Sequence, residues 1–396
     1  MNMNKREQIL TLLKCCICIG GSVGIVNNCI GIYYSSIADG LDTGVGAVSI
    51  MVTLMSLATA FGNPVLMRLI RLRIPVNRLM SAGVIMVAFA YLIMSFAGNI
   101  WLLYAAGIIM GIGACCFSNL PVTLILRDWY GEKIGSVTGI AMGFGGIFGA
   151  VFNPVFSKLI ESLGWNNSLR IQALILLVLV FPCALLSRMN SDKGSAATAA
   201  NNKIIHDETV TYISERTMLL LIIAGVLFSC QCGMNSHFSA LGVDQGYTLQ
   251  FSAVILSVAM ISNVSFKFLH GTLADATSPY FSSILCTGIG FAGTLCMLLF
   301  HASAFMMMAG AFMYGAYFSV SQVGMSLLCQ SIAKEKYGEI YSRITMFATI
   351  AYAVSLSVYG LIRDHVGSYL PSLILVLVMS TLAIITTRLL KKSAQR

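Results

Sequence analysis

Residues 79–97 read LMSAGVIMVAFAYLIMSFA, nineteen consecutive positions without Asp, Glu, Lys or Arg. A helix of about 20 apolar residues is long enough to cross the roughly 30 Å hydrocarbon core of a bilayer. The rest of the chain has the same character: 57% of its 396 residues are hydrophobic, only 10% are charged, and the mean hydropathy is +0.85. In soluble domains about a quarter of the residues are charged. The sequence therefore predicts an integral membrane protein.

Twelve apolar runs of this kind follow one another along the chain. We predict membrane-spanning helices at about 10–34, 45–67, 79–97, 101–126, 134–160, 169–187, 217–240, 250–272, 280–301, 303–332, 340–362 and 369–387. The polar stretch between spans six and seven contains GSAATAANN and is typical of a flexible linker. We predict an all-α polytopic protein with a six-helix half at 1–188, a cytoplasmic linker at 189–216 and a second six-helix half at 217–396.

The net charge of +9 is distributed unevenly between alternate loops. If the N-terminus is cytoplasmic, most Lys and Arg residues lie inside, and the outside ends hold only Lys158, Arg170 and Arg363. Cytoplasmic loops attract basic residues, so the pattern predicts a multi-pass protein of the cell membrane with both termini cytoplasmic. The positive charge is thus a topology signal, and we expect lipid rather than nucleic acid as the partner.

The two halves repeat each other. Tyr130-Gly131-Glu132-Lys133-Ile134-Gly135-Ser136, which enters span five, is echoed by Tyr337-Gly338-Glu339-Ile340-Tyr341-Ser342, which enters span eleven. Duplicated halves with a substrate site between them are a recurrent plan of secondary transporters. The repeat favours two pseudo-symmetric six-helix bundles around a central cavity.

On these residues the chain resembles the major facilitator superfamily over nearly its full length. Gly271-Thr272-Leu273-Ala274-Asp275, after span eight, is similar to the second copy of the family's Gly-x-Leu-Ala-Asp loop signature. The first copy, expected after span two, lacks its acidic residue, because Gly62-Asn63-Pro64-Val65-Leu66 runs directly into Arg68. The resemblance assigns Gly271, Asp275 and Arg127 to gating loop motifs.

Within the superfamily, several stretches look most like the oxalate/formate antiporter and monocarboxylate transporter group. They are Arg127-Asp128-Trp129-Tyr130, Asn153-Pro154, Gly164-Trp165, Asp244-Gln245-Gly246 and Gly367-Ser368-Tyr369. In that group span eight carries an Asp-x-x-x-Arg pair whose basic residue engages the carboxylate of the substrate. The matching positions here are Asn263 and Lys267, so the positive charge is kept and the acid is replaced.

Lys267 is the most informative single residue. It lies eight positions before Asp275, about 12 Å along a helix from the cytoplasmic end. A basic side chain at such depth costs roughly 2.5–3.5 kcal/mol or more, and its default interpretation is functional. The alternative is that its apolar stem lets the ammonium reach the inner headgroups. Both interpretations stay open from the sequence.

Amide side chains concentrate in spans one, four, seven and ten, the helices that line the central cavity in the resembled fold. These residues are Asn27, Asn28, Asn119, Gln231, Asn235 and Gln322. Buried amides are costly in lipid and should face protein or water. We interpret the set as cavity-lining, with hydrogen-bonded contacts between helices as the alternative for each member.

Tyrosines extend this set of candidates. Tyr317 in span ten could donate a hydrogen bond into the cavity, or it could be a core aromatic residue. Span eleven lacks the family's second substrate-binding base and offers Tyr352 among its polar residues, which favours a monoanion over a dicarboxylate. In span five, Gly135, Gly139 and Gly143 recur every four residues and predict a close helix approach.

Several kinds of site are not visible. The twelve cysteines lie mostly in apolar runs without zinc-type spacing, so we expect no metal and no cofactor. No Asp or Glu lies deep in a span, which disfavours sodium symport and acid-based proton coupling. His237, near the outer end of span seven, remains as a titratable candidate. No arrangement of nucleophile and base points to an enzyme.

These observations predict a secondary transporter that moves a small organic anion, a monocarboxylate in particular, by alternating access. Exchange or weak proton coupling would drive it, and we expect it to act as a monomer. Two alternatives stay open: a transporter or efflux pump for a neutral or amphipathic solute, and a sensor that has lost transport.

Overall fold

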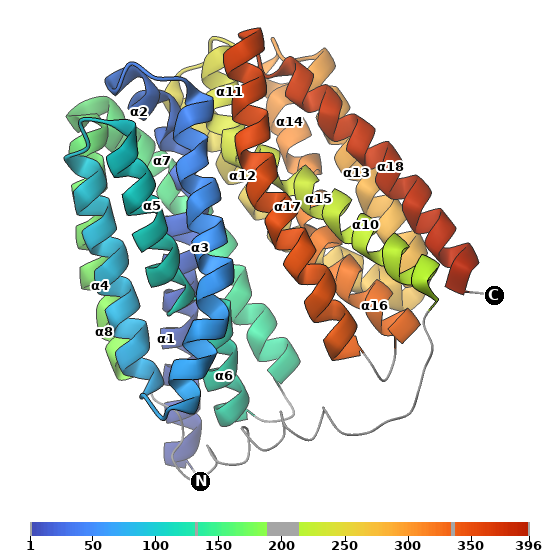
Figure 1. Cartoon of the computed structure of the whole chain (residues 1–396), viewed down its shortest axis with the longest axis horizontal. Coiled ribbons are helices and arrows are strands. Elements are labelled where there is room, and N and C mark those ends of the chain that lie inside the picture. The colour runs from blue at the N-terminus through green and yellow to red at the C-terminus, as the bar shows by residue number, and fades with distance from the viewer. Residues whose placement is uncertain (1, 131–133, 188–213, 334–336, 395–396) are drawn as a thin grey trace. The chain divides into compact units, whose positions relative to one another are not determined.

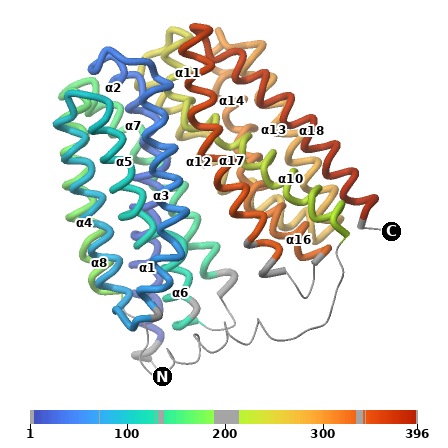
Figure 2. Tube along the Cα trace, viewed as in Figure 1, coloured from blue at the N-terminus to red at the C-terminus, as the bar shows by residue number. Residues whose placement is uncertain are grey.

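A computed structural model describes residues 2–130, 134–187, 214–333 and 337–394, and all of its regular elements are helices (Figures 1 and 2). The first part of the chain forms α1 (Asn2–Ile19), η1 (Gly20–Asn28), η2 (Ile30–Tyr33), α2 (Tyr34–Gly40), α3 (Val45–Arg71), α4 (Val76–Ser95), α5 (Ile100–Cys115), α6 (Asn119–Tyr130), α7 (Ile134–Ile175), η4 (Leu176–Val180) and α8 (Phe181–Leu186).

The second part forms α10 (Glu215–Gly233), η5 (Met234–His237), α11 (Phe238–Asp244), α12 (Leu249–Ala276), α13 (Pro279–Leu299), α14 (Ala304–Tyr314), α15 (Ala316–Ser319), η6 (Val320–Gly324), α16 (Met325–Ala333), α17 (Tyr337–Val366) and α18 (Leu370–Ala394). The predicted all-α polytopic fold is therefore confirmed.

Eleven continuous helical stretches of the described chain are long and apolar enough to cross a membrane. One of them, Val137–Leu186, has 50 residues, about twice the length that a bilayer requires. Its helix α7 contains Gly164 with φ 80° and ψ 159°, where the backbone leaves the helical region and the chain turns. This stretch therefore holds predicted spans five and six, which reconciles eleven stretches with twelve spans.

Only glycine adopts the backbone conformation of Gly164 at low cost, since other residues lose about 1–3 kcal/mol there. We expect Gly164→Ala to lower the free energy of unfolding by about that amount, measured by thermal unfolding in detergent. Gly139→Ala is the matched control, because a Cβ at this helical glycine meets nothing within 4 Å. Equal melting temperatures for the two variants would contradict the expectation.

The chain folds into two compact units. Unit 1 comprises the described residues within 1–30 and 57–209, and unit 2 those within 31–56 and 210–396. This division differs from the predicted halves in one segment, because residues 31–56 group with the second half. The predicted linker at 189–216 lies almost entirely outside the described residues.

In unit 1, η1 packs closely against α7. A Cβ on Gly24 would lie 2.9 Å from the carbonyl oxygen of Gly145, and a Cβ on Gly145 would lie 2.8 Å from Val23. The close approach predicted on the Gly139 and Gly143 face is wrong, since a Cβ at either position meets nothing within 4 Å. Of Gly139, Gly143 and Gly145, it is Gly145 that lies on a face of α7 in close contact with a neighbouring helical segment.

In unit 2, the helices enclose a core of apolar side chains from α10, α12, α13, α15 to α18 and η6. Its largest members include Phe228, Phe266, Leu328 and Ile344. Moving apolar surface out of water stabilises a protein by about 25 cal/mol per Å². Inside a bilayer the surroundings are already apolar, so close packing between helices stabilises the core instead.

The two halves break their first helix at equivalent places. The 3₁₀ segments Ile30–Tyr33 and Met234–His237 begin 204 positions apart. Each is followed by a seven-residue helix, Tyr34–Gly40 and Phe238–Asp244. With the same offset, Asn27 corresponds to Gln231. The repeat that appears in the sequence is thus also a repeat of helix irregularities.

Candidate functional site

The central pair of the candidate site lies on α12. Asn263 and Lys267 are four residues apart, hence on one face of the helix. Asn263 is 8% exposed, and its Oδ1 has no hydrogen-bond partner among the described residues. Lys267 is close enough to Cys232 of α10 for an electrostatic interaction, and within the described chain no carboxylate pairs with its ammonium group. The pair thus presents a cation and an acceptor that other side chains leave unused.

Gln231 on α10 is the second component of the site. It is fully buried, and neither Nε2 nor Oε1 finds a hydrogen-bond partner in the described part of the chain. Its backbone carbonyl, in contrast, accepts a hydrogen bond from the Tyr314 hydroxyl. A buried amide without partners costs about 1–3 kcal/mol per unmade group. Gln231 therefore has the capacity to bind a solute or water through both amide atoms.

Asn235 and Tyr352 extend this surface. Asn235 lies in η5, one turn beyond Gln231, is 5% exposed, and its Oδ1 has no partner among the described residues. Tyr352 of α17 is half-buried, and its hydroxyl lies next to Ser236, the neighbour of Asn235. Since η5 contacts both α12 and α17, these polar groups lie on adjacent helices of unit 2.

Two predicted site residues of unit 2 have different surroundings. The Tyr317 hydroxyl lies 2.6 Å from Ser380 Oγ of α18 and accepts a hydrogen bond of 3.4 Å from Thr294 of α13. These contacts place Tyr317 inside the helix bundle, in keeping with the core-aromatic alternative. Gln322, in the π-helical segment η6, is exposed.

In unit 1, two of the predicted site residues donate hydrogen bonds to backbone carbonyls, and two are exposed. Asn28 Nδ2 donates a hydrogen bond of 3.1 Å to the carbonyl of Gly145, a contact between η1 and α7. This is the interhelical role that the sequence left as the alternative. Asn27 is exposed, and its Nδ2 donates to the Ser22 carbonyl 2.8 Å away. Asn119, the first residue of α6, is exposed.

The gating motifs are exposed or lie outside the described residues. Asp275 lies in the last turn of α12 with an exposed side chain. A Cβ on Gly271 would meet nothing within 4 Å. The side chain of Arg127 is not among those described, so its predicted role stays a prediction.

Sequence reasoning does not select two buried polar residues of unit 1. Asn153 of α7 is fully buried, and neither of its amide atoms has a partner among the described residues. Gln172, also fully buried, donates to the Ile25 carbonyl at 3.0 Å and to the Tyr91 hydroxyl at 2.8 Å. Asn153 stands out in the sequence only as part of an Asn-Pro motif, although an amide within an apolar run is sufficient signal.

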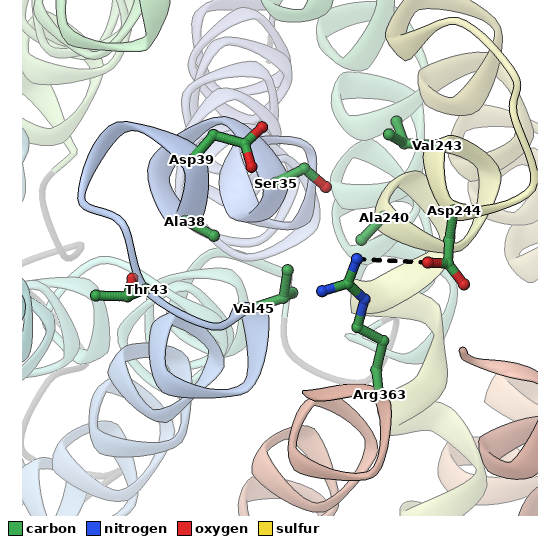
Figure 3. Close-up of a pocket in the computed structure, with 9 residues that line it drawn as sticks. All are labelled: Ser35, Ala38, Asp39, Thr43, Val45, Ala240, Val243, Asp244 and Arg363. Carbon is green, nitrogen blue, oxygen red and sulfur yellow. Dashed lines mark hydrogen bonds and ion pairs between the residues drawn. The ribbon is translucent and has the colours of Figure 1, made fainter. Parts of the chain in front are cut away.

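A pocket of about 310 Å³ lies elsewhere in unit 2, between α2, α3, α11 and α17 (Figure 3). Its polar lining includes Ser35, Asp39, Asp244 and Arg363. Arg363 Nη2 lies 3.4 Å from Asp244 Oδ1, the contact drawn as a dashed line. The sequence places Arg363 at an outer loop and gives no indication of this ion pair.

The sequence profile described as "Major Facilitator Superfamily" matches residues 16–356. The chain belongs to the major facilitator superfamily. A curated relative, described as the uncharacterized MFS-type transporter YhjX of Escherichia coli strain K12, is 21% identical over 287 residues, 64% of this chain and 70% of that protein. Proteins of the superfamily are transporters, so this chain is a membrane transporter for small molecules and not an enzyme.

Solved structures show the same fold. A point mutant of the nucleoside transporter NupG aligns with a TM-score of 0.79 and 11% identity, covering 96% of this chain and 99% of that one. A bacterial homologue of the human lysosomal transporter Spinster, inward-facing and unoccupied, aligns with a TM-score of 0.73 and 13% identity, covering 100% and 98%. At these identities the likeness establishes the two-domain transporter fold and not the substrate.

Proposed function

We propose that this superfamily member transports a small organic anion, a monocarboxylate in particular, by alternating access across the cell membrane. Lys267 carries the proposal: it is a cation inside a membrane helix, and no carboxylate in the described chain pairs with it. A single ammonium attracts an anion as a point charge. The subgroup motifs around Arg127, Asn153 and Asp244 support the same substrate class by resemblance.

In this proposal the amides orient the anion that Lys267 attracts. Asn263 lies one turn from Lys267, and Gln231 and Asn235 extend from the neighbouring segment, each with unused hydrogen-bonding atoms. Without a deep carboxylate in the spans, exchange of one anion for another, or weak proton coupling, would drive transport. We further propose that both termini are cytoplasmic and that the monomer is the working unit.

A neutral polar solute is the second candidate, and the Gln231 amide favours it, since both of its atoms could bind a solute without charge. Counterflow uptake in proteoliposomes separates the two candidates. We expect saturable uptake of a labelled monocarboxylate, competed by other monocarboxylates and not by neutral analogues such as their amides. Uptake of a neutral solute with no monocarboxylate flux would overturn the anion proposal.

Replacing Gln231 with leucine tests whether its amide meets the substrate. We expect uptake to fall about 3- to 10-fold, the value of one or two lost neutral hydrogen bonds. The thermal stability of the protein should be kept or rise, because an apolar side chain replaces a buried amide without partners.

Gln250→Leu, at the exposed start of α12, is the control and should transport normally. If Gln231→Leu transports like the parent protein, Gln231 does not contact the substrate.

A further inference from the structure

The candidate site leaves unused a fully buried histidine of unit 2, His270 on α12. Its Nδ1 lies 3.1 Å from Ser319 Oγ of α15, and its Nε2 lies 3.3 Å from Ser283 Oγ of α13. Both serines are fully buried as well. Each nitrogen of the ring is therefore held by a hydroxyl group inside the helix bundle.

A glycine of η6 closes the space around the ring. A Cβ on Gly324 would lie 2.6 Å from His270 Cε1 and 2.9 Å from Ser283 Oγ, so a larger residue would push η6 away from the imidazole. We call His270, Ser283, Ser319 and Gly324 the histidine cage. His270 lies six residues before Ala276, the last residue of α12, which is about 9 Å along the helix from its end.

The two serine hydroxyls of the cage already donate their protons elsewhere. Ser319 Oγ donates to the Ala316 carbonyl at 2.7 Å, and Ser283 Oγ donates to the Pro279 carbonyl at 2.7 Å. A serine hydroxyl has one proton and two lone pairs, so each Oγ is then left to accept from the imidazole. Both ring nitrogens must donate in this arrangement, and only the positively charged ring does so.

The neutral ring fits the same cage after one hydroxyl rotates. If the Ser283 proton turns from the Pro279 carbonyl to His270 Nε2, that nitrogen accepts while Nδ1 still donates to Ser319. One hydrogen bond replaces another, and the Pro279 carbonyl keeps a hydrogen bond of 3.2 Å from the Ser282 hydroxyl. The cage therefore accommodates both protonation states without movement of a helix.

His237, also fully buried, has partners of a different kind. Its Nε2 lies 2.7 Å from the Leu356 carbonyl, which can only accept, and its Nδ1 lies 3.0 Å from the Tyr369 hydroxyl, which can donate. These partners match the neutral ring. The two-acceptor pattern around His270 is thus a property of its serines and not of burial alone.

Lys267 is the charged neighbour of the cage. The charged residues of α12 are Lys267, three positions before His270 and hence its neighbour on the helix surface, and the exposed Asp275. The three segments around the ring, α13, α15 and η6, contain no Asp, Glu, Lys or Arg. Their titratable side chains are Tyr280, Cys296, Tyr317 and Cys286, of which Cys286 interacts with Ser319. A proton on His270 therefore adds a second positive charge beside Lys267.

We propose that His270 is a proton-binding site of this transporter and that its proton is coupled to transport. The proton comes from water and returns to water, so the imidazole is the group that changes charge. Beside Lys267, the charged ring attracts the same anion, and a bound anion in turn favours the charged ring. By linkage, each raises the affinity of the other by the same factor. The coupling rests on the proposed anion function, whereas the proton site does not.

Nitrogen-15 magnetic resonance of histidine-labelled protein in lipid nanodiscs tests the proton site without a substrate. The signals of the His270 ring are those missing from His270→Gln. We expect both ring nitrogens to be protonated at about pH 5 and one of them at about pH 8, the range in which histidine titrates. His237 should stay neutral and serves as the internal reference. A His270 ring that keeps one protonation state across this range overturns the proposal.

Two neighbouring serines of α13 supply the matched variants. Ser283→Ala removes the acceptor of Nε2 and should lower the proton affinity of His270 about tenfold, which moves the transition about one pH unit toward acid. Ser282→Ala should leave it in place, although Ser282 is also fully buried and donates to the same Pro279 carbonyl. Equal shifts in both variants, or none in Ser283→Ala, would show that the cage does not hold the proton. If His270→Gln does not fold, the signal that moves only in Ser283→Ala identifies the ring.

Uptake in proteoliposomes then tests the coupling. An inward gradient of about two pH units should raise net monocarboxylate uptake by the parent at least about tenfold, against a limit of about 100-fold at one proton per anion. Relative to its own counterflow at equal pH, His270→Gln should show no response to the gradient, and Ser282→Ala should respond like the parent. If His270→Gln responds equally, or the parent does not respond, His270 is not the coupling group. If the parent shows no counterflow, the anion proposal fails, and the resonance experiment decides the proton site.

Discussion

Replacing Lys267 with alanine is expected to reduce uptake of the transported anion about 10- to 100-fold in counterflow. Hydrogen bonds to a charged group are worth about 1.5–3 kcal/mol, which corresponds to that range. Lys267→Arg should keep part of the activity, because it retains the charge but presents a planar fork in place of a compact ammonium. Protein folding should be little affected, since no ion pair within the described chain is lost with Lys267.

Lys158→Ala is the matched control, because Lys158 also lies in a long membrane helix, α7, with an exposed side chain. It should transport like the parent. If Lys267→Ala takes up the anion normally while remaining folded, Lys267 has a structural role, and transport of a neutral solute becomes the favoured function. A loss of uptake in both variants would instead indicate that removal of any basic residue impairs the protein.

The fold could be predicted because hydropathy reports it directly. Every apolar run of about 20 residues must satisfy its backbone internally in lipid, and a helix does so. The irregular segments could not be predicted in the same way. The π-helical turns at Gly20–Asn28 and Val320–Gly324 and the 3₁₀ turn at Met234–His237 change the backbone hydrogen bonds without changing hydropathy. Gly164, Gly246 and Gly367, by contrast, combine a recognisable residue type with a positive φ.

The candidate site could be predicted in part. Amides and lysines are costly in lipid, and this cost singled out Gln231, Asn263 and Lys267. Among the described residues, Gln231 and Asn263 do have polar atoms without hydrogen-bond partners, and Lys267 has no carboxylate partner. The same reasoning cannot tell which face of a helix a residue occupies. Asn28 and Tyr317 satisfied the same criterion and yet find partners on neighbouring helices of their own unit.

The contact between Gly46 and Asp364 shows the limit most clearly. Both residues lie near predicted loop ends, where a glycine and an aspartate are ordinary. Their significance comes from a separation of 318 residues that the fold closes to 2.7 Å. One sequence contains no signal for such a pairing, because neither residue is unusual in its local context.

A disulfide between positions 53 and 357 is expected to arrest transport completely. The hydroxyl oxygens of Thr53 and Ser357 lie 2.6 Å apart, close to the sulfur separation of about 2.05 Å in a disulfide. If α3 must separate from α17 in each cycle, an oxidised Thr53→Cys/Ser357→Cys pair should lower flux to background, and reduction should restore it. Uptake in proteoliposomes before and after oxidant, and again after reductant, measures this.

The single variants Thr53→Cys and Ser357→Cys are the controls, and they are needed because the native Cys230 lies close to α17, with its Sγ 3.6 Å from the Ala351 carbonyl. Each should transport equally with and without oxidant. A fully crosslinked double variant that still transports at the parent rate would show that α3 and α17 stay together throughout the cycle. In that case the hydroxyl and glycine contacts would form a permanent interface between α3 and α17 within unit 2. The two units would then have to move about a bend within α3, between residues 56 and 57.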